Sequence, residues 1–263
     1  MEDDRTALMQ AMFSALRAGR DLDHAGIRYS RDEMHDLLCA WIPAEIIVMR
    51  ACAAGPSVVI AAPHVSFDNW TQYFANRVAA DLKCGEVIAR NFRDDDGGVM
   101  PISIGRHIHV NRPTESTRKG GAERQTDRAR QVFEQYRVAL GRAGRALPLD
   151  LLIELHGHRQ HTRMEVATYG LTLDEARRCR DAYEKLREAT PGLPDIAIEP
   201  LDVLQFTARQ AKELGSLREE NCRRALHIEI PRTCREDERA RSAFRPLLAD
   251  WLSFCVTELA PQS

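Results

Sequence analysis

The sequence lacks the features that mark several large classes of protein. No apolar run approaches the 18 residues that a membrane-spanning helix requires, and the opening residues, Met1 to Asp4, are acidic where a secretory leader would be basic. A net charge of −2 provides no field to attract nucleic acid or an anionic membrane, although 33 of the 37 basic residues are arginine. We therefore expect a cytoplasmic protein with no nucleic-acid partner and no membrane partner.

The cysteines do not form a recognisable framework. There are seven of them, an odd number, and no Cys-x-x-Cys pair occurs. Most fall within helical or strand patterns, so we expect free, buried thiols rather than disulfides or a thiolate metal site.

The composition is that of a globular protein, with 44% apolar and 29% charged residues in 263 positions. Predicted strands alternate with predicted helices, and no repeat or linker interrupts them. This pattern favours a single three-layer α/β domain, with a mixed, mostly parallel sheet and helices on both faces. Residues 1–54 look like an N-terminal helical cover of the same domain, with a second helix from about Asp32 that includes Ile46 and Ile47.

Apolar runs and periodicity locate the remaining elements. Strands are expected at 58–62, 85–90, 106–110, 149–155, 195–199 and 225–230, and helices after Asp68, at 122–140, 172–189 and 204–214, and up to about Leu259. The segments 91–98 and 114–121 are expected to be loops, because they are polar or rich in glycine. Thr172 with Glu175 is a capping-box pattern.

One buried strand and the polar turn after it are central to the chain. Val58–Ala62 is a run of small or β-branched apolar residues, and Pro63 ends its ladder because proline has no N–H to donate. His64 and Asp68 follow, and the apolar spacing beyond them predicts a helix whose first turn contains Asp68. Open α/β sheets usually form their sites at such strand ends. Both residues are candidate metal ligands; alternatively, Asp68 caps the helix and His64 is an ordinary loop histidine.

Polar side chains stand at three further strand ends, namely Asn111 with Arg112, Glu154 with His156 and His158, and Glu229. A catalytic zinc takes three protein ligands and keeps one position for water, and His64, Asp68 and His156 supply such a set. A carboxylate outside that set must take the proton from the water, a role that suits Glu229. Arg112 would hold the developing negative charge, with Asn111 beside it.

The order and spacing of these residues resemble the N-formylglutamate amidohydrolase family. The matching segments are Ala-Pro-His64 with Phe-Asp68-x-x-Thr71, Val-Asn111-Arg112-Pro113, Glu154-Leu-His156-Gly-His158 and His-Ile-Glu229-Ile. The similarity covers roughly residues 57–232 and extends, more distantly, to zinc carboxypeptidases and aspartoacylase-like deacylases. Each motif is short, and the succession of all four carries the resemblance.

The resemblance implies a zinc carboxypeptidase-like fold and an enzyme with one zinc ion per chain, in which residues 55–263 form a metal-dependent hydrolase domain. It implies that His64, Asp68 and His156 bind the zinc and that Glu229 is the general base. Arg112 would be catalytic too, and the substrate-binding residues would be Asn111, Arg112, His158 and Arg106.

The chain departs from the family in two places. Carboxypeptidases have His-x-x-Glu where this chain has His64-x-x-x-Asp68, and deformylases commonly carry aspartate two residues before the Asn-Arg pair, where this chain has His109. The second departure leaves the substrate open. We expect His109, like His107 and His161, to be an ordinary loop or edge residue.

Several site residues have an alternative explanation. Glu229 could be a strand glutamate paired with Arg232, and Arg112 could be a surface arginine after a strand. His158 fits either a supporting position behind the ligands or a contact with substrate.

The first interpretation of the chain is a zinc-dependent amidohydrolase that cleaves a small N-acyl amino acid such as N-formylglutamate. The second is a carboxypeptidase-like hydrolase acting on a short peptide. The third is a metal-binding or partner-binding protein of the same fold that has no catalytic activity.

Overall fold

The computed structural model describes residues 2–41, 44–65, 68–90, 92, 108–116 and 123–260. The helices are α1 (Glu2–Arg17), α2 (Arg31–Trp41), α3 (Thr71–Leu82), α4 (Asp127–Gly144), α5 (Leu173–Glu188), α6 (Arg209–Leu214) and α7 (Glu238–Leu259). Within these ranges, none of the helices combines the length and apolar character needed to span a bilayer.

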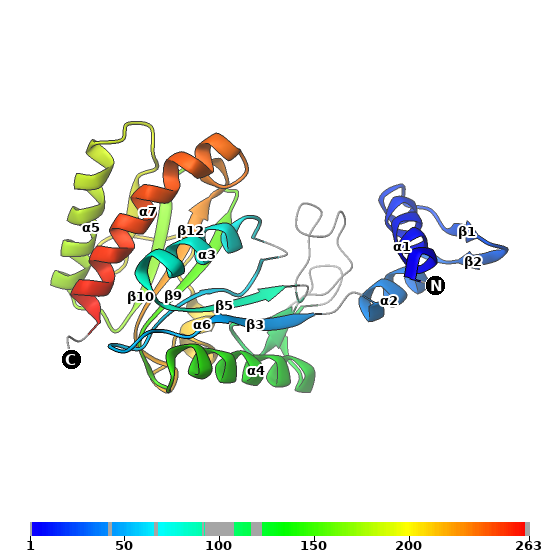
Figure 1. Ribbon diagram of the computed structural model, residues 1–263, viewed down its shortest axis with the longest axis horizontal. Helices are drawn as coiled ribbons and strands as arrows, with labels where there is room; N and C mark the ends of the chain where they lie inside the picture. Colours follow the sequence, from blue (N-terminus) through cyan, green and yellow to red (C-terminus); the bar gives the residue numbers. More distant parts are fainter. Residues whose placement is uncertain are drawn as a thin grey trace.

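A seven-stranded sheet forms the centre of the fold (Figure 1). Its strands, in spatial order, are β11 (Ile196–Ile198), β10 (Met164–Tyr169), β12 (Cys222–Pro231), β9 (Leu149–His158), β4 (Val58–Ala62), β5 (Gly85–Arg90) and β3 (Glu45–Arg50). β10 pairs with β12, and β5 with β3, in antiparallel fashion, while the other four pairings are parallel. The predicted mixed, mostly parallel sheet is therefore confirmed.

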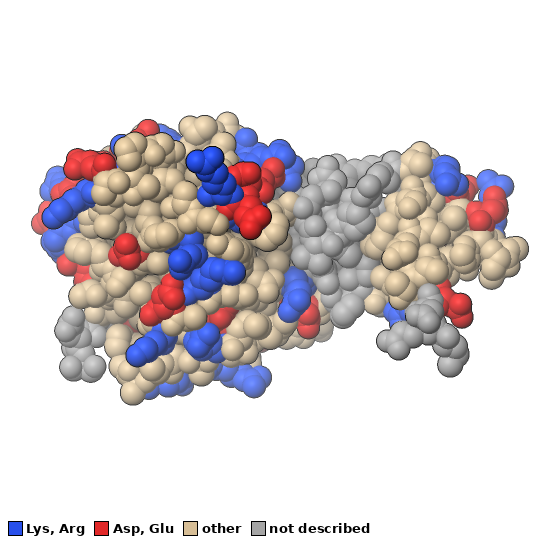
Figure 2. Space-filling view, turned by 45° about the horizontal axis from the view of Figure 1, so that its top comes forward, with Lys and Arg blue, Asp and Glu red and all other residues tan. Residues whose placement is uncertain are grey.

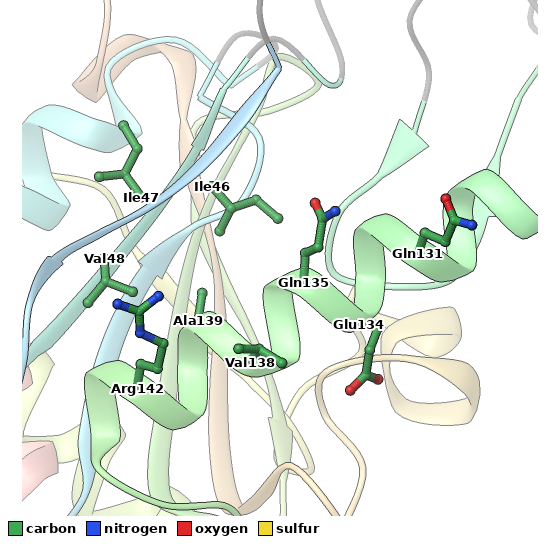
Figure 3. A pocket seen from close by; sticks show the side chains of 9 residues that line it. All are labelled: Ile46, Ile47, Val48, Gln131, Glu134, Gln135, Val138, Ala139 and Arg142. Atoms are coloured by element: carbon green, nitrogen blue, oxygen red, sulfur yellow. The ribbon is translucent and has the colours of Figure 1, made fainter.

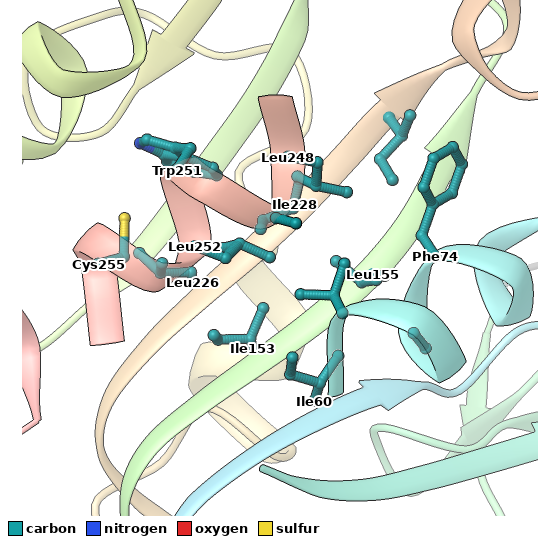
Figure 4. Close-up of a cluster of buried hydrophobic side chains, with 14 of the residues drawn as sticks. Ile60, Phe74, Ile153, Leu155, Leu226, Ile228, Leu248, Trp251, Leu252 and Cys255 are labelled. Carbon is teal, nitrogen blue, oxygen red and sulfur yellow. The ribbon is translucent and has the colours of Figure 1, made fainter. Parts of the chain in front are cut away.

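Helices cover both faces of the sheet. α3, α5 and α7 supply Phe74, Tyr183 and Trp251 to one buried cluster. Figure 4 shows apolar side chains of α3 and α7 meeting those of β9 and β12. α4 supplies Tyr136 and Leu140 to a second cluster on the opposite face. Burial of apolar surface on each face stabilises the layered arrangement, at about 25 cal/mol per Å² removed from water.

Strand β9 shows how the sequence separates core from site. Leu151, Ile153 and Leu155 all belong to the cluster under α3, α5 and α7. Successive side chains of a strand point to opposite faces, so Glu154 and His156 lie on the α4 side. The carboxyl end of β9 is apolar on one face and polar on the other.

The N-terminal elements have a core of their own. α1 and α2 pack with the antiparallel hairpin of β1 (Leu22–His24) and β2 (Ile27–Tyr29) around Met12, Ala15, Leu22, Met34 and Leu38 (Figure 1). The division of the chain at residue 54 stays a prediction.

The expected extension of the second helix over Ile46 and Ile47 is wrong. α2 ends at Trp41, and Glu45–Arg50 forms β3, which pairs with β5. The run Ile46-Ile47-Val48 is β-branched, which favours a strand, and a proline at position 43 in the sequence opposes a continuous helix.

Two further expectations need correction, and one strand has no counterpart among the predicted elements. β10 was not expected, and the strand predicted at 106–110 is reduced, within the described residues, to β6 (Ile108–His109). β6 lies outside the main sheet, in a three-stranded sheet with β7 (Thr114–Glu115) and β8 (Arg124–Gln125), so the loop expected at 114–121 begins with a short strand. Arg106 and His107 lie outside the described residues.

Charge is distributed without a dominant sign. Figure 2 shows basic and acidic side chains interspersed over the visible face, in keeping with the net charge of −2.

Candidate metal-binding and catalytic site

Two neighbouring parallel strands bring the first candidate residues together. β4 and β9 pair in register, with Ala61 opposite Glu154, so their carboxyl ends lie side by side. His64 follows β4 in the turn before α3, and His156 lies near the end of β9. The two residues are 92 positions apart in sequence, yet their Nδ1 atoms are 3.2 Å apart.

Asp68 lies before α3 rather than in its first turn, so that expectation is wrong. Trp70 has a φ of 72°, a left-handed conformation that interrupts the helix upstream of Thr71. The helix start has no side-chain cap, and only the main-chain oxygen of Asp68 accepts a hydrogen bond from Thr71 Oγ1, at 2.8 Å. The carboxylate is not a helix cap and instead faces the histidines.

The donor atoms of His64, Asp68 and His156 form a nearly equilateral triangle. Asp68 Oδ2 lies 3.5 Å from His64 Nδ1 and 3.3 Å from His156 Nδ1, and all three side chains are buried. A tetrahedral zinc with bonds of about 2.0–2.1 Å separates its ligands by about 3.3 Å. One oxygen and two nitrogens at these separations fit a zinc ion with one position left open.

The triangle combines a carboxylate of lowered pKa with two histidines whose pKa values are shifted in opposite directions. Burial raises the pKa of Asp68, but hydrogen bonds from His156 and His64 outweigh it and hold the pKa below its ordinary range. Burial keeps the pKa of His64 well below its usual value. Burial also opposes protonation of His156, yet Asp68 and Glu154 raise its pKa to about 10. A metal binding here competes with a proton on His156.

Glu154 is a buried carboxylate behind His156. Its Oε1 accepts a hydrogen bond from Tyr136 Oη at 3.0 Å. Its Oε2 accepts one from Asn111 Nδ2 at 3.0 Å and lies 3.4 Å from His156 Nε2 and 3.2 Å from His227 Nδ1. Burial alone would raise the pKa of Glu154, but the hydrogen bonds from His156 and His227 keep it well below its usual value. A carboxylate on the far nitrogen of a metal-binding histidine fixes the ring and its tautomer.

Glu229 lies on the same sheet face as His156. The two residues are register partners on β12 and β9, and partners in register project to the same side. Glu229 is outside the triangle, and its Oε1 lies 3.4 Å from His227 Nε2. Arg232 pairs with Glu236 instead, so the alternative of a Glu229–Arg232 ion pair is wrong.

Arg112 is bound to a residue that the sequence did not single out. Its Nε and Nη2 donate to the two carboxylate oxygens of Glu123, at 3.1 and 2.8 Å. His109 Nε2 lies 2.8 Å from the same carboxylate. His109 lies on the edge strand β6, as one form of the expectation has it, but its side chain is buried and paired with Glu123. Neighbouring Asn111 points to Glu154, as described above.

His158 lies on the same strand as His156 but contacts other residues. Its Nε2 donates to the main-chain oxygen of Arg163 at 3.0 Å, and its ring packs on His161, with centroids 4.1 Å apart. Burial lowers the pKa of His158. Its role as a supporting or substrate-contacting residue stays a prediction.

A buried arginine connects the segments that carry the site. Arg235 donates to the main-chain oxygens of Ile230 and His158, at the ends of β12 and β9. It also donates to the main-chain oxygen of Asn69, the residue after Asp68. Its guanidinium occupies the space beside Gly157, where a Cβ would lie 2.3 Å from Arg235 Cζ. This explains the glycine between the two histidines.

The sequence interpretation missed His227, Tyr136, Glu123 and Arg235. His227 had a usable signal, because it precedes Glu229 by two residues and so shares its sheet face. Tyr136 looked like any other member of the apolar stripe of α4, and nothing local marked Glu123 or Arg235.

A separate surface hollow of about 710 Å³ lies between β3 and α4. Figure 3 shows that side chains such as Ile46, Val48, Gln135 and Arg142 line it. It contains none of the predicted site residues.

Comparison with known proteins identifies the fold. A bacteriophage poly-γ-glutamate hydrolase has a TM-score of 0.51 at 11% identity, covering 86% of this chain and 95% of that one. An N-formylglutamate amidohydrolase from Ralstonia eutropha JMP134 has a TM-score of 0.49 at 14% identity, covering 82% and 98%. A metallo-carboxypeptidase from Burkholderia cenocepacia has a TM-score of 0.47 at 15% identity, covering 88% and 70%.

Sequence comparison adds no family, since neither a protein-family model nor a curated protein matches the chain. At 11% identity, the likeness to the phage hydrolase shows a shared fold. The three-layer α/β fold with a mixed, mostly parallel sheet that the sequence predicts is thus confirmed.

Proposed function

We propose that the protein is a zinc-dependent amidohydrolase that cleaves the amide bond of a small N-acyl amino acid, with N-formylglutamate-like compounds first among the candidates. The observation that carries the proposal is the buried triangle of His64 Nδ1, Asp68 Oδ2 and His156 Nδ1, with separations of 3.2 to 3.5 Å. Its size and its ligand types suit one zinc ion with an open position.

The residues around the triangle support hydrolysis. A zinc ion, when bound, polarises a carbonyl and lowers the pKa of water to about 7. Glu229 shares the sheet face of His156 without belonging to the triangle, which suits a base that removes a proton from the attacking water. His227 Nε2 lies 3.4 Å from Oε1 of Glu229, and Glu154 lies behind His156, where it can orient the ring.

Metal analysis of the purified chain is the first test. We expect close to one zinc per chain in the wild type and its loss in His64→Ala and His156→Ala, because each change removes one of three ligands. His24→Ala, in the β1–β2 hairpin, is the matched control and should retain zinc. Full occupancy in both ligand variants would refute the metal site.

Hydrolysis of N-acyl amino acids and short peptides completes the test. A deacylase needs the acyl group, whereas a carboxypeptidase needs a free C-terminus, so the panel separates the two activities. Glu229→Gln keeps the side-chain shape and removes its basicity, and should retain zinc while losing roughly 10²–10⁴ in turnover. Glu236→Gln, which removes a nearby carboxylate paired with Arg232, should retain activity. Full turnover in Glu229→Gln would exclude Glu229 as the base.

A further inference from the structure

The carboxylate of Glu123 is held by four hydrogen-bond donors. Its Oε1 lies 2.8 Å from both Arg112 Nη2 and His109 Nε2. Its Oε2 accepts from Arg112 Nε at 3.1 Å and from Thr114 Oγ1 at 2.9 Å. Two donors on each oxygen satisfy the main acceptor positions of a carboxylate, with the planar Arg112 group binding at two points.

The side chains that donate these hydrogen bonds are more buried than the carboxylate that accepts them. The side chains of His109 and Arg112 are 2% and 16% exposed, whereas that of Glu123 is 24% exposed. Thr114 is buried. Without a carboxylate, the Arg112 guanidinium and the Thr114 hydroxyl would lose the hydrogen bonds that Glu123 accepts from them in this largely buried cradle, which is energetically unfavourable.

The cradle borders the metal triangle. The ring of His109 packs edge-on against that of His64, with centroids 5.6 Å apart. Asn111, which precedes Arg112, reaches Glu154 behind His156. A molecule with its scissile amide at the triangle can therefore present a carboxylate to the cradle.

We propose that Glu123 is a built-in competitor, which occupies the cradle of His109, Arg112 and Thr114 and is displaced by the carboxylate of an acyl amino acid. The inference rests on the proposed function for the identity of the ligand, and it assigns Glu123 a role in setting affinity. A group on the same chain competes at an effective concentration on the order of millimolar, so only ligands that match the whole site bind well.

The competitor role is distinguishable from an orienting role. If Glu123 blocks the cradle, its removal strengthens the binding of a free carboxylate. If Glu123 only holds Arg112 in position, its removal weakens that binding, because the guanidinium loses its support. The two roles predict opposite signs.

The test is calorimetric titration of the full chain with succinate, in the purified form and again after treatment with a chelator. We expect Glu123→Gln to bind succinate at least fivefold more tightly than the wild type. Arg112→Lys added to Glu123→Gln should abolish the gain, since lysine lacks the two-point fork. Uncharged succinamide should bind none of the variants more tightly than it binds the wild type.

Glu115→Gln is the matched control. Glu115 lies on β7, next to Thr114, and is paired with Arg128 and not with the cradle residues. This variant therefore changes the net charge by the same amount without opening the cradle. Its affinity for succinate should stay within twofold of the wild type.

Equal or weaker binding by a folded Glu123→Gln protein would overturn the proposal, with folding checked by circular dichroism. A gain of the same size in Glu115→Gln would also overturn it, because the effect would then be one of net charge. The chelated titrations need neither zinc nor turnover. A failure of the proposed hydrolysis thus leaves this result interpretable, and the reverse is also true.

Discussion

Glu154 and Tyr136 allow the support of the metal ligand to be separated from the stability of the core. The two side chains meet in the interior, Tyr136 fully buried and Glu154 nearly so. Tyr136 binds only Oε1 of the carboxylate, whereas Oε2 faces His156, His227 and Asn111. Changes at the two ends of this contact should therefore differ in their effects.

Glu154→Gln should weaken zinc binding by about 10- to 100-fold, the usual effect of losing a partner behind a metal ligand. The glutamine side chain has one acceptor oxygen, which can take the position of Oε2. There it still meets Asn111, His227 and His156, at 3.0, 3.2 and 3.4 Å, but without a negative charge. The charge that fixes the His156 ring is lost. The loss in affinity corresponds to about 1.4–2.7 kcal/mol.

Tyr136→Phe should destabilise the fold by about 1.5–3 kcal/mol, because one hydrogen bond to a buried charge disappears. Zinc affinity should change less than threefold, since Oε2 keeps its three contacts. Competition with a chromophoric chelator measures the affinity, and urea unfolding measures the stability. Equal zinc affinity in Glu154→Gln and wild type, or a larger loss in Tyr136→Phe, would refute the assigned orienting role.

Two further predictions concern the surroundings of the site. Gly157→Ala should lower stability by about 1–3 kcal/mol, because the added Cβ meets the buried Arg235 guanidinium, and an unchanged melting temperature would show that Arg235 can move freely. Burial favours a higher pKa for Glu123, but hydrogen bonds from His109 and Arg112 depress it well below 4.5. A carboxyl group whose pKa is lower in the folded than in the unfolded protein stabilises the fold at pH values above its unfolded-state pKa. This stabilisation is lost as the pH falls toward its folded-state pKa. The stability advantage of wild type over Glu123→Gln should therefore be full at pH 7 and shrink below about pH 4.5. Thermal melts between pH 7 and pH 3 test this, and an advantage independent of pH would contradict it.

The elements that the sequence predicted best were those with a strong local pattern. Val58–Ala62 and Gly85–Arg90 are strands with the expected bounds. The first is an unbroken apolar run, which suits a strand buried on both faces, and the second has the apolar centre Val87-Ile88-Ala89. The capping box of Thr172 and Glu175 begins α5 as expected, since both partners lie within one helical turn. For β3 the prediction is wrong because the periodicity of so short an apolar run does not separate a helix from a strand. Its β-branched residues favour the strand, and pairing with β5 forms it.

The candidate site shows the same division. The sequence indicated which polar residues follow apolar strands, and that was enough to name His64, Asp68 and His156. Tertiary structure decided that β9 lies between β4 and β12. This order brings Nδ1 of His64 and Nδ1 of His156, which are 92 positions apart in the sequence, to within 3.2 Å. It also decided that the carboxylate of Asp68 faces histidines instead of capping α3, that Glu154 supports His156, and that Arg112 holds Glu123. Periodicity reports which face of an element is buried, whereas the partner on that face depends on strand order and on the packing of distant segments.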